Sequence, residues 1–180
     1  MRDENISITG YHGTLMSNAK NIRRFGFHKS NKEIEWLGSG VYFFEQFEYA
    51  KEWARQQIRN ARSLNQPVVL TATISTSPSG VLDLDIPDVM KAFEGELQYI
   101  VENILSKGPG GAPEFNDDRE ARCFFCNFYA QAHKDVKVIA FSFPRRYYND
   151  FGFPLVLYKR QLCVLDESCI KMPLDKLEAV

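Results

Sequence analysis

Three short segments of the chain combine glycine with hydrogen-bonding or aromatic side chains. They are 11–14 (YHGT), 37–44 (LGSGVYFF) and 160–166 (RQLCVLD). Taken singly, each has an ordinary structural explanation. A histidine after a strand usually satisfies a hydrogen bond, Gly-x-Gly usually forms a turn, and a tyrosine in an apolar strand usually belongs to the core with its hydroxyl paired. Their meaning therefore depends on their order along the chain.

In that order the segments resemble the PARP-like ADP-ribosyltransferases. That family has a strand ending in His-Gly-Ser/Thr, followed by Ile-x-x-x-Gly-hydrophobic, which 22–27 (IRRFGF) matches. Next comes Gly-x-Gly-hydrophobic-Tyr-Phe, which 38–43 (GSGVYF) matches. The family's late strand begins with Glu and ends with Asp, and 161–166 (QLCVLD) matches it except at the first residue. The family's closing motif around a proline resembles 171–177 (KMPLDKL).

The resemblance covers residues 11–54 and 156–177, whereas 55–155 match no motif of the family. It implies an α+β fold of the ADP-ribosyltransferase type, in which two short, mostly antiparallel sheets form a split β core flanked by helices. It also implies that NAD is the co-substrate. The short chain is similar to stand-alone toxin or phage-defence members, for which an antitoxin or inhibitor protein is a candidate partner.

The family's site residues map onto four positions near the start of the chain. Cleavage of the bond between nicotinamide and ribose passes through an oxocarbenium-like state. By the resemblance, His12 hydrogen-bonds a ribose hydroxyl, which a neutral imidazole can do. Gly13 lets the backbone approach the nicotinamide carboxamide, and Thr14 adds a hydroxyl there. Tyr42 supplies an aromatic face to the nicotinamide ring.

A second aromatic residue is expected eleven positions after the tyrosine, and Trp53 stands there. Ala50 replaces the small hydroxyl residue that the family usually has eight positions after the tyrosine. By the resemblance, Trp53 completes an aromatic sandwich around the cationic ring and adds cation–π attraction. The alternative is that Trp53 only packs its helix against the sheet.

The main departure from the family is Gln161, where the polymerising members have glutamate. A glutamate binds the ribose, stabilises positive charge and polarises the acceptor. A glutamine keeps the hydrogen bonds but loses the charge, so chain elongation is not expected. Three outcomes stay open: transfer of a single ADP-ribose unit, slow hydrolysis of NAD, and binding without turnover.

A base can come from elsewhere in the chain, and the alignment itself has an alternative. Glu45 follows the tyrosine strand, and Glu114 and Asp118 lie near the loop rich in glycine and proline. A shift of one residue places Arg160 or Leu162 at the glutamate position instead. Charged residues on loops and helix faces are usually only solvated, so none of the three carboxylates is preferred.

The leading hypothesis is a mono-ADP-ribosyltransferase acting on a protein or a nucleic acid. A loop containing Arg145, Arg146, Tyr147 and Tyr148 pairs guanidinium groups with aromatic rings, a combination that binds phosphates and stacks bases. Arginines of the second helix can extend this basic surface: Arg55, Arg59 and Arg62. The alternatives are a non-enzymatic NAD or ADP-ribose binding module, an NAD glycohydrolase toxin and, ranked last, a tRNA 2′-phosphotransferase.

Composition is consistent with one globular domain spanning 1–180. The 180 residues are 44% hydrophobic, and 22 basic against 23 acidic side chains give no overall bias toward a polyanion. No apolar run approaches the roughly 20 residues of a membrane helix, and no signal-peptide pattern begins the chain. Cys123 and Cys126 form one Cys-x-x-Cys, which with His133 gives too few ligands for zinc. We therefore expect no metal, reduced thiols and a cytoplasmic location.

The elements that must position these residues follow from the hydrophobic pattern. Helices are expected from Ser17 to Gly26, over about 46–63, from Pro87, and from a capping box of Asp117 and Glu120. A polar loop is expected at 144–150. Because strands and helices do not alternate regularly, an α+β domain is favoured over a doubly wound sheet. The expected strands are 6–11, 40–44, 68–74, 81–84, 136–143, 155–158 and 162–165.

Overall fold

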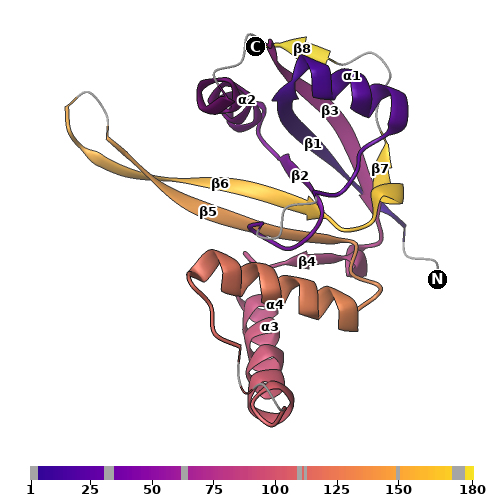
Figure 1. The fold of residues 1–180 in the computed structure, drawn as a ribbon, viewed down its shortest axis with the longest axis vertical. Helices are drawn as coiled ribbons and strands as arrows, with labels where there is room; N and C mark the ends of the chain where they lie inside the picture. Colours follow the sequence, from indigo (N-terminus) through magenta and orange to yellow (C-terminus); the bar gives the residue numbers. More distant parts are fainter. Residues whose placement is uncertain are drawn as a thin grey trace.

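A computed structural model describes residues 4–30, 35–61, 65–108, 111, 113–148, 151–171 and 177–180, with the side chains of 60, 61, 148 and 177 left out of the description. The described chain is α+β, as the sequence predicts, with helices on both faces of a mixed sheet (Figure 1). The four α-helices are α1 (Met16–Phe25), α2 (Phe47–Ala61), α3 (Pro87–Ile100) and α4 (Asp118–Ala132).

The described strands form one sheet in the order β4-β5-β6-β2-β1-β3-β7, with β8 also paired to β3. Their pairing is antiparallel except between β4 and β5. The strands are β1 (Ile6–Leu15), β2 (Val41–Phe44), β3 (Pro67–Thr76), β4 (Val81–Asp83), β5 (Val138–Tyr148), β6 (Pro154–Val164), β7 (Ile170–Lys171) and β8 (Leu177–Ala179).

The expectation of two separate sheets is wrong, because the short strand β2 joins the two halves. β2 pairs with β6 along its whole length, from Val41 to Phe44. On its other side β2 pairs with β1 at a single position, Tyr11 opposite Phe44. The sheet is therefore continuous, but β1 and β2 part immediately after this pair.

Two apolar cores lie on opposite faces of the sheet, since successive residues of a strand point to opposite sides. On β6, Leu162 and Val164 belong to the first core, which also contains Ala19 of α1 and Phe43 of β2. Cys163 between them belongs to the second core. That second core is covered by α3 and α4, through Phe93 and Cys126 among others.

Most expected elements are found with small shifts at their ends. Pro87 opens α3, and Gly26 ends α1. Asp117 caps α4 by accepting a hydrogen bond from the N–H of Glu120 at 2.8 Å. Ser17, however, lies inside α1 rather than capping it, because Leu15 is the residue before the helix and β1 runs directly into it.

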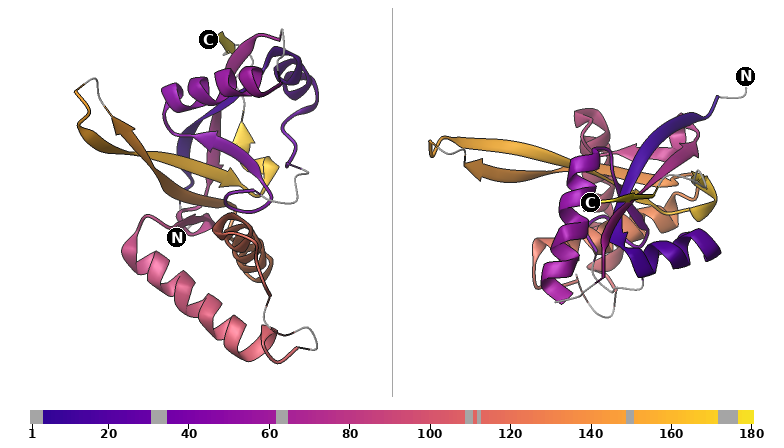
Figure 2. Two further views of the ribbon diagram at one scale, coloured as in Figure 1. Left: turned by 60° about the vertical axis from the view of Figure 1, so that its left-hand side comes forward. Right: turned by 90° about the horizontal axis from the view of Figure 1, so that it is seen from above.

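The expected loop at 144–150 is the second error. β5 continues through Tyr148, and β6 begins at Pro154, so the two strands form one long hairpin. Its outer part, residues 144–148 and 151–158, projects from the body in all views, and we call it the β5–β6 arm (Figures 1 and 2). The adjacent arginines and tyrosines favoured a solvent-exposed loop. They instead form a strand, because β5 and β6 stay paired from Pro144 opposite Tyr158 to Tyr148 opposite Pro154.

Candidate active site

A cavity of about 700 Å³ opens where β1 and β2 part. Its walls come from β1, β2, β6, α2, the segment before β2 and the start of α4. Every sequence-predicted site residue lies on it, although those residues are far apart in the chain: His12, Gly13, Thr14, Tyr42, Trp53 and Gln161.

His12 bridges the gap between β1 and β2 with its side chain. Its Nδ1 lies 2.8 Å from the carbonyl oxygen of Tyr42, and its ring packs edge-on against Phe27 and Phe43, with centroids 5.3 and 5.7 Å away. Burial lowers the pKa of His12 below its usual 6.5, although the backbone hydrogen bond opposes this shift. A neutral ring whose Nδ1–H donates to a carbonyl has a lone pair on Nε2, so this atom is an acceptor for a ligand hydroxyl.

Tyr42 is fixed at its hydroxyl. The hydroxyl accepts a hydrogen bond from the N–H of Leu37 and donates one to the carbonyl of Gly38, both at 2.7 Å. Burial strongly raises its pKa, so the phenol stays protonated. Gly38 has φ +92°, a conformation that suits glycine. The Gly-x-Gly step thus forms a turn held by Tyr42, and the tyrosine ring is left as the contact surface.

Gly13 is required by packing, a reason that the sequence did not indicate. A Cβ at this position would lie 1.9 Å from the carbonyl oxygen of Ala50, so only glycine lets α2 lie this close to β1. The Gly13 carbonyl also accepts a hydrogen bond from Nε2 of Gln57, at 3.2 Å. Thr14 is buried, with its hydroxyl 3.5 Å from the Asn18 amide.

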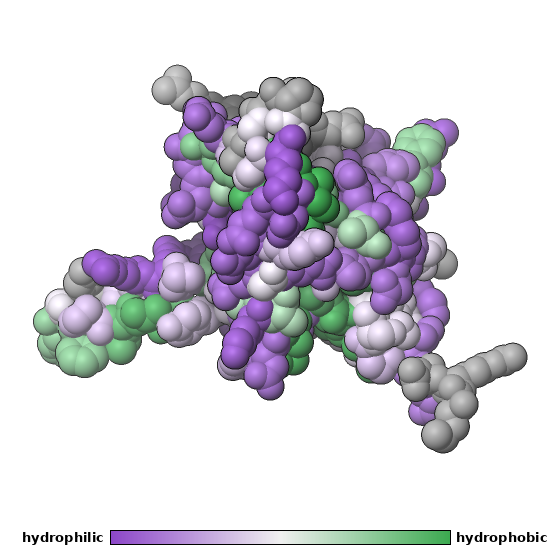
Figure 3. Space-filling view, turned by 90° about the horizontal axis from the view of Figure 1, so that it is seen from below, coloured by the Kyte–Doolittle hydropathy of each residue, from purple (hydrophilic) through white to green (hydrophobic). Residues whose placement is uncertain are grey.

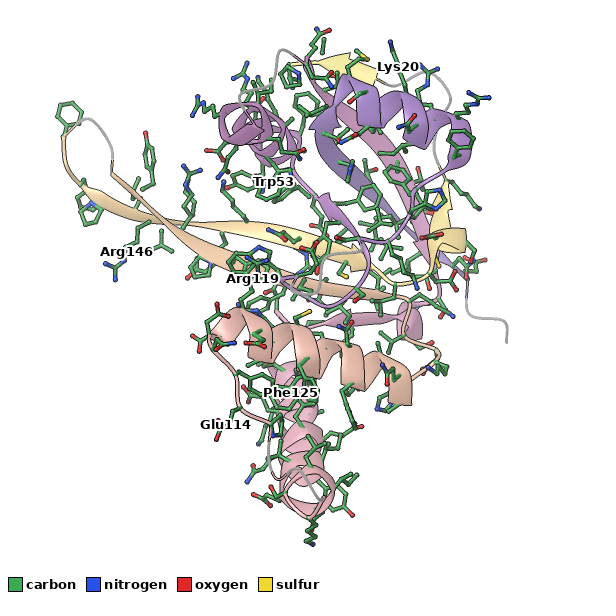
Figure 4. The ribbon with its side chains drawn as sticks, in the orientation of Figure 1. Lys20, Trp53, Glu114, Arg119, Phe125 and Arg146 are labelled. Atoms are coloured by element: carbon green, nitrogen blue, oxygen red, sulfur yellow. The ribbon has the colours of Figure 1, made fainter. Side chains whose placement is uncertain are left out.

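Trp53 faces the cavity instead of packing α2 onto the sheet. Ala50 and Ala54 fill the sheet-facing side of α2 and are fully buried, whereas Trp53 is 42% exposed. Figure 4 shows it extending from α2, with Arg119 extending from the start of α4. The alanines therefore make the contact between α2 and the sheet, and the Trp53 ring borders the cavity.

Gln161 is the residue of its strand that reaches the cavity. It lies opposite Phe44 of β2. Its two neighbours, the alternatives at this position, point elsewhere: Leu162 is fully buried in the first core, and Arg160 forms ion pairs outside the cavity. The carboxylates that Arg160 contacts are those of Glu45, Asp83 and Asp85. Glu45 is therefore engaged, and it does not line the cavity.

A carboxylate does line the cavity, and sequence reasoning missed it. Glu35 is the only acidic residue among the described lining residues. It accepts a hydrogen bond from the Ser30 hydroxyl, and its N–H lies 3.4 Å from Sγ of Cys123 on α4. Nothing in the local pattern around Glu35 distinguished it. The proposed alternatives Glu114 and Asp118 do not line the cavity.

Helix α4, which lies outside the resemblance, holds the segment that carries Glu35. The guanidinium groups of Arg119 and Arg122 lie 5.6 and 5.5 Å from the Trp36 ring centroid. The Arg122 Nε–H donates to the carbonyl of Trp36 at 3.1 Å. One turn further along, Asn127 Oδ1 accepts the N–H of Ser39 at 2.7 Å. Arg119 and Trp36 also line the cavity, so α4 contributes a cation to it.

The arginine-tyrosine segment lies away from the cavity, on the β5–β6 arm. Arg145 forms an ion pair with Glu52 of α2, and Lys159 binds the same carboxylate, so two cations share one negative charge. Arg146 is exposed and Tyr147 is 45% exposed, while the side chain of Tyr148 lies outside the described residues. On α2, Arg55 and Arg59 are exposed, and Arg62 is outside the description.

The cysteines have structural surroundings. Cys123 and Cys126 are buried, and burial raises the pKa of the Cys126 thiol to about 12. His133 lies 2.7 Å from a carboxylate oxygen of Glu96 on α3. Within the described ranges, no three His, Cys, Asp or Glu side chains gather as metal ligands. Among the same residues, no helix has the length and apolarity that crossing a membrane requires.

Comparison with known proteins adds no further constraint: no family model matches this chain, and no curated protein sequence matches it. The chemistry of the site must therefore be inferred from the geometry of the cavity.

Proposed function

We propose that this chain is an NAD-dependent mono-ADP-ribosyltransferase that transfers one ADP-ribose unit to a macromolecular acceptor and releases nicotinamide. The observation that carries the proposal is that His12, Tyr42 and Gln161 come from three neighbouring strands, β1, β2 and β6, and line one cavity together with Trp53. The cavity volume, about 700 Å³, lies within the range of roughly 300–1,000 Å³ usual for small-molecule sites.

The donor half of the reaction is supported by the groups that face the cavity. Nε2 of His12 accepts a hydrogen bond from a ribose hydroxyl, because Nδ1 is already committed to the Tyr42 carbonyl. The rings of Tyr42 and Trp53 offer two aromatic faces to the cationic pyridinium. The carbonyl oxygen of Gly13 accepts a hydrogen bond from Gln57 and has a second lone pair for an N–H of the carboxamide. The carboxamide can also take the place of the Gln57 amide when that side chain rotates away.

The transfer step breaks one bond and forms one. The C1′–N bond breaks, and its electron pair stays on the nicotinamide nitrogen. An oxygen or nitrogen nucleophile of the acceptor forms the new bond to C1′ and gives up its proton. Gln161 holds the sugar without charge, and the cavity's negative charge is supplied by Glu35. In this proposal Glu35 stabilises the oxocarbenium-like sugar and accepts the nucleophile's proton.

The primary test is transfer of label from NAD carrying a labelled adenine. The protein is incubated with protein, RNA and DNA fractions, and His12→Ala and Glu35→Gln are compared with the wild type and with Glu48→Gln, an exposed control on α2. We expect label in one fraction with the wild type and the control, and at least tenfold less with the other two variants. NAD binding with neither label transfer nor nicotinamide release would exclude the enzyme.

Gln161→Glu tests the position where the chain departs from the family. A carboxylate there adds charge next to the developing oxocarbenium ion, so we expect faster consumption of NAD, measured as nicotinamide released. Gln161→Leu, which removes the amide hydrogen bonds, serves as the matched variant and should be slower. An unchanged or lower rate for Gln161→Glu would mean that Gln161 does not contact the donor sugar.

A second candidate function, NAD binding without turnover, is favoured by two observations. The family's charge is replaced by the amide of Gln161, and the amide of Gln57 already occupies the Gly13 carbonyl. Calorimetric titration with NAD, followed by assay of free nicotinamide, separates the two functions: a binding module gives heat of binding but no nicotinamide.

A further inference from the structure

Gln57 of α2 places a primary amide beside the Gly13 carbonyl in the wall of the cavity. Its Nε2 donates a hydrogen bond to the carbonyl oxygen of Gly13 at 3.2 Å, and both residues line the cavity. Because a carbonyl oxygen can only accept, this contact fixes which end of the Gln57 amide faces Gly13. The other end, Oε1, has no hydrogen-bond partner among the residues that the structure describes, so it is left as an acceptor at the cavity.

The position of Gln57 follows from the close packing of α2 on β1. A Cβ at Gly13 would lie 1.9 Å from the carbonyl oxygen of Ala50 and 3.1 Å from the backbone nitrogen of Ala54. Both alanines are fully buried, whereas Gln57, on the next turn of the helix, is half-buried. Residues three or four apart share one face of a helix. Gln57 therefore continues the face of α2 that packs on β1, and it brings its amide to the cavity.

Two neighbouring oxygen acceptors at the cavity favour a ligand group that brings hydrogen-bond donors. The Gly13 carbonyl oxygen keeps a second lone pair, and Oε1 of Gln57 lies close to it because it shares a carbon with the bonded Nε2. A primary amide offers two N–H donors, whereas an ionised carboxylate offers none and carries a negative charge. A buried polar group without a partner is costly, and a buried charge without one is costlier. The two oxygens therefore favour an amide over a carboxylate.

We propose that Gln57 stays bonded to Gly13 when the donor binds, and that its Oε1 accepts an N–H of the nicotinamide carboxamide. The two N–H groups of the carboxamide then meet the Gly13 carbonyl and the Gln57 amide. Gln57 is thereby a specificity-determining residue: it favours the dinucleotide whose pyridine ring carries an amide and disfavours the one whose ring carries a carboxylate. This inference rests on the function proposed above, since it takes NAD to be the ligand of the cavity.

A contact and a competitor give effects of opposite sign when Gln57 is truncated. If Oε1 binds the carboxamide, Gln57→Leu removes a hydrogen bond to the ligand, and NAD binds more weakly. If the Gln57 amide only occupies the place of the carboxamide, the same change frees the Gly13 carbonyl, and NAD binds more tightly. ADP-ribose lacks the nicotinamide, so neither case changes its affinity. The direction of the change for NAD, measured against ADP-ribose, therefore separates the two roles.

Calorimetric titration of the full chain with three ligands tests the role of Gln57. The ligands are NAD, nicotinic acid adenine dinucleotide, which has a carboxylate in place of the carboxamide, and ADP-ribose. We expect the wild type to prefer NAD over the acid form by about a hundredfold or more. Gln57→Leu should bind NAD roughly fivefold to tenfold more weakly and ADP-ribose as the wild type does. The control is Gln98→Leu, an exposed position on α3, which lies below α2 (Figure 1) where the surface is largely hydrophilic (Figure 3).

Gln57→Lys tests the same role through a gain of affinity, which a damaged protein cannot give. The ammonium group can still donate to the Gly13 carbonyl, and its charge attracts a carboxylate. We expect the acid form to bind roughly tenfold more tightly than it binds the wild type, and NAD to bind more weakly.

The results separate this inference from the proposed function. A wild type that binds neither NAD nor ADP-ribose would overturn the donor site, and the role of Gln57 with it. If both ligands bind, the role of Gln57 alone is overturned by any of three results: an acid form bound as tightly as NAD, a Gln57→Leu variant with unchanged or higher NAD affinity, or a Gln57→Lys variant that does not gain affinity for the acid form. The donor site would stand in each of these cases.

Discussion

The cavity and the β5–β6 arm both present aromatic side chains to solvent, but in opposite settings. In the cavity, Tyr42 and Trp53 stand beside His12 and Gln161, so polar groups converge on the same space as the rings. On the arm, rings follow one another along a projecting ribbon, and the charged Arg145 at its base is already paired with Glu52. Concave rings with converging polar groups are typical of a site for a small ligand, whereas the rings of the arm project and enclose no such space.

The two regions also differ in how their conformation is fixed. At the cavity, Nδ1 of His12 is bonded to the backbone of Tyr42, and the Tyr42 hydroxyl is bonded to the backbone of Leu37 and Gly38. The arm is held by its own strand pairing, with one anchor at Glu52. Substitutions should therefore have larger effects on folding and NAD binding at the cavity than on the arm.

The largest expected contrast is between two glycines. Gly13→Ala places a methyl group 1.9 Å from the Ala50 carbonyl oxygen, which must displace α2 and close or distort the cavity. We expect a loss of about 3 kcal/mol or more in unfolding free energy, with loss of NAD binding. Gly152→Ala, on the arm, meets no atom but has φ +73°, which costs about 1 kcal/mol. Denaturant unfolding of both variants makes the comparison, and equal losses would contradict the packing described for Gly13.

A smaller contrast is expected between two tyrosines that lose their hydroxyls. Tyr42→Phe removes two hydrogen bonds of 2.7 Å and leaves the Leu37 N–H without its acceptor, so we expect about 1–3 kcal/mol lower stability. Tyr147→Phe, on the arm, should change stability by less than about 0.5 kcal/mol. Thermal unfolding of the two variants measures both effects. If Tyr42→Phe were neutral, the hydroxyl would not be what holds the turn before β2.

The next contrast concerns affinity for NAD. Trp53→Ala removes one of the two rings around the proposed nicotinamide position, and a stacked ring contributes about 1–3 kcal/mol. We expect binding roughly tenfold weaker, with little change in stability because Trp53 is 42% exposed. Phe153→Ala, its counterpart on the arm, should bind NAD within twofold of the wild type. Calorimetric titration with NAD measures the affinity of both variants. Equal affinities of Trp53→Ala and Phe153→Ala would mean that Trp53 lies outside the donor site.

The smallest expected effect is a pH dependence confined to the cavity. Burial lowers the folded-state pKa of His12 below the usual value of 6.5, so between the two values the unfolded chain binds a proton that the folded chain does not. Stability is therefore full above pH 6.5 and decreases as the pH falls below it, with a slope of at most about 1.4 kcal/mol per pH unit. NAD affinity decreases only at lower pH, where the folded protein itself takes up the proton at His12.

The control for this pH dependence is His12→Gln, which should flatten the profile between pH 7 and 5.5. The described part of the arm contains no histidine, aspartate or glutamate. Phe153→Ala, on the arm, should therefore leave the pH profile of stability unchanged. A wild-type stability profile that rises on acidification, or one that His12→Gln leaves unchanged, would show that His12 is not the group that titrates.

Prediction from the sequence succeeded where local signals were strong. Pro87 and Gly26 gave helix ends correctly, and the capping interaction of Asp117 was found as expected. The errors came from long-range contacts. Whether 144–148 form a loop or a strand depends on pairing with 154–158, and whether two half-sheets join depends on one pair, Tyr11 and Phe44.

The residues of the candidate site also divide into those that local sequence signals indicated and those that only long-range packing brings to the cavity. The order of their segments singled out His12, Tyr42 and Gln161, and the spacing from Tyr42 singled out Trp53; all four line the cavity. Glu35, Arg119 and Gln57 were not found. Each reaches the cavity only because an element places it there, α2 for Gln57 and α4 for Arg119, and such proximity has no signature in local sequence.

The sequence by itself determined the α+β class, and it singled out His12, Tyr42, Trp53 and Gln161, which the structure brings to one cavity. The tertiary structure alone decided that the strands form one sheet, that Trp53 faces a cavity, that Glu35 is the carboxylate in it, and that the β5–β6 arm projects. The physical reason is that a helix end or an amphipathic face depends on neighbours a few residues away. A cavity or a sheet edge depends on which distant segments pack together.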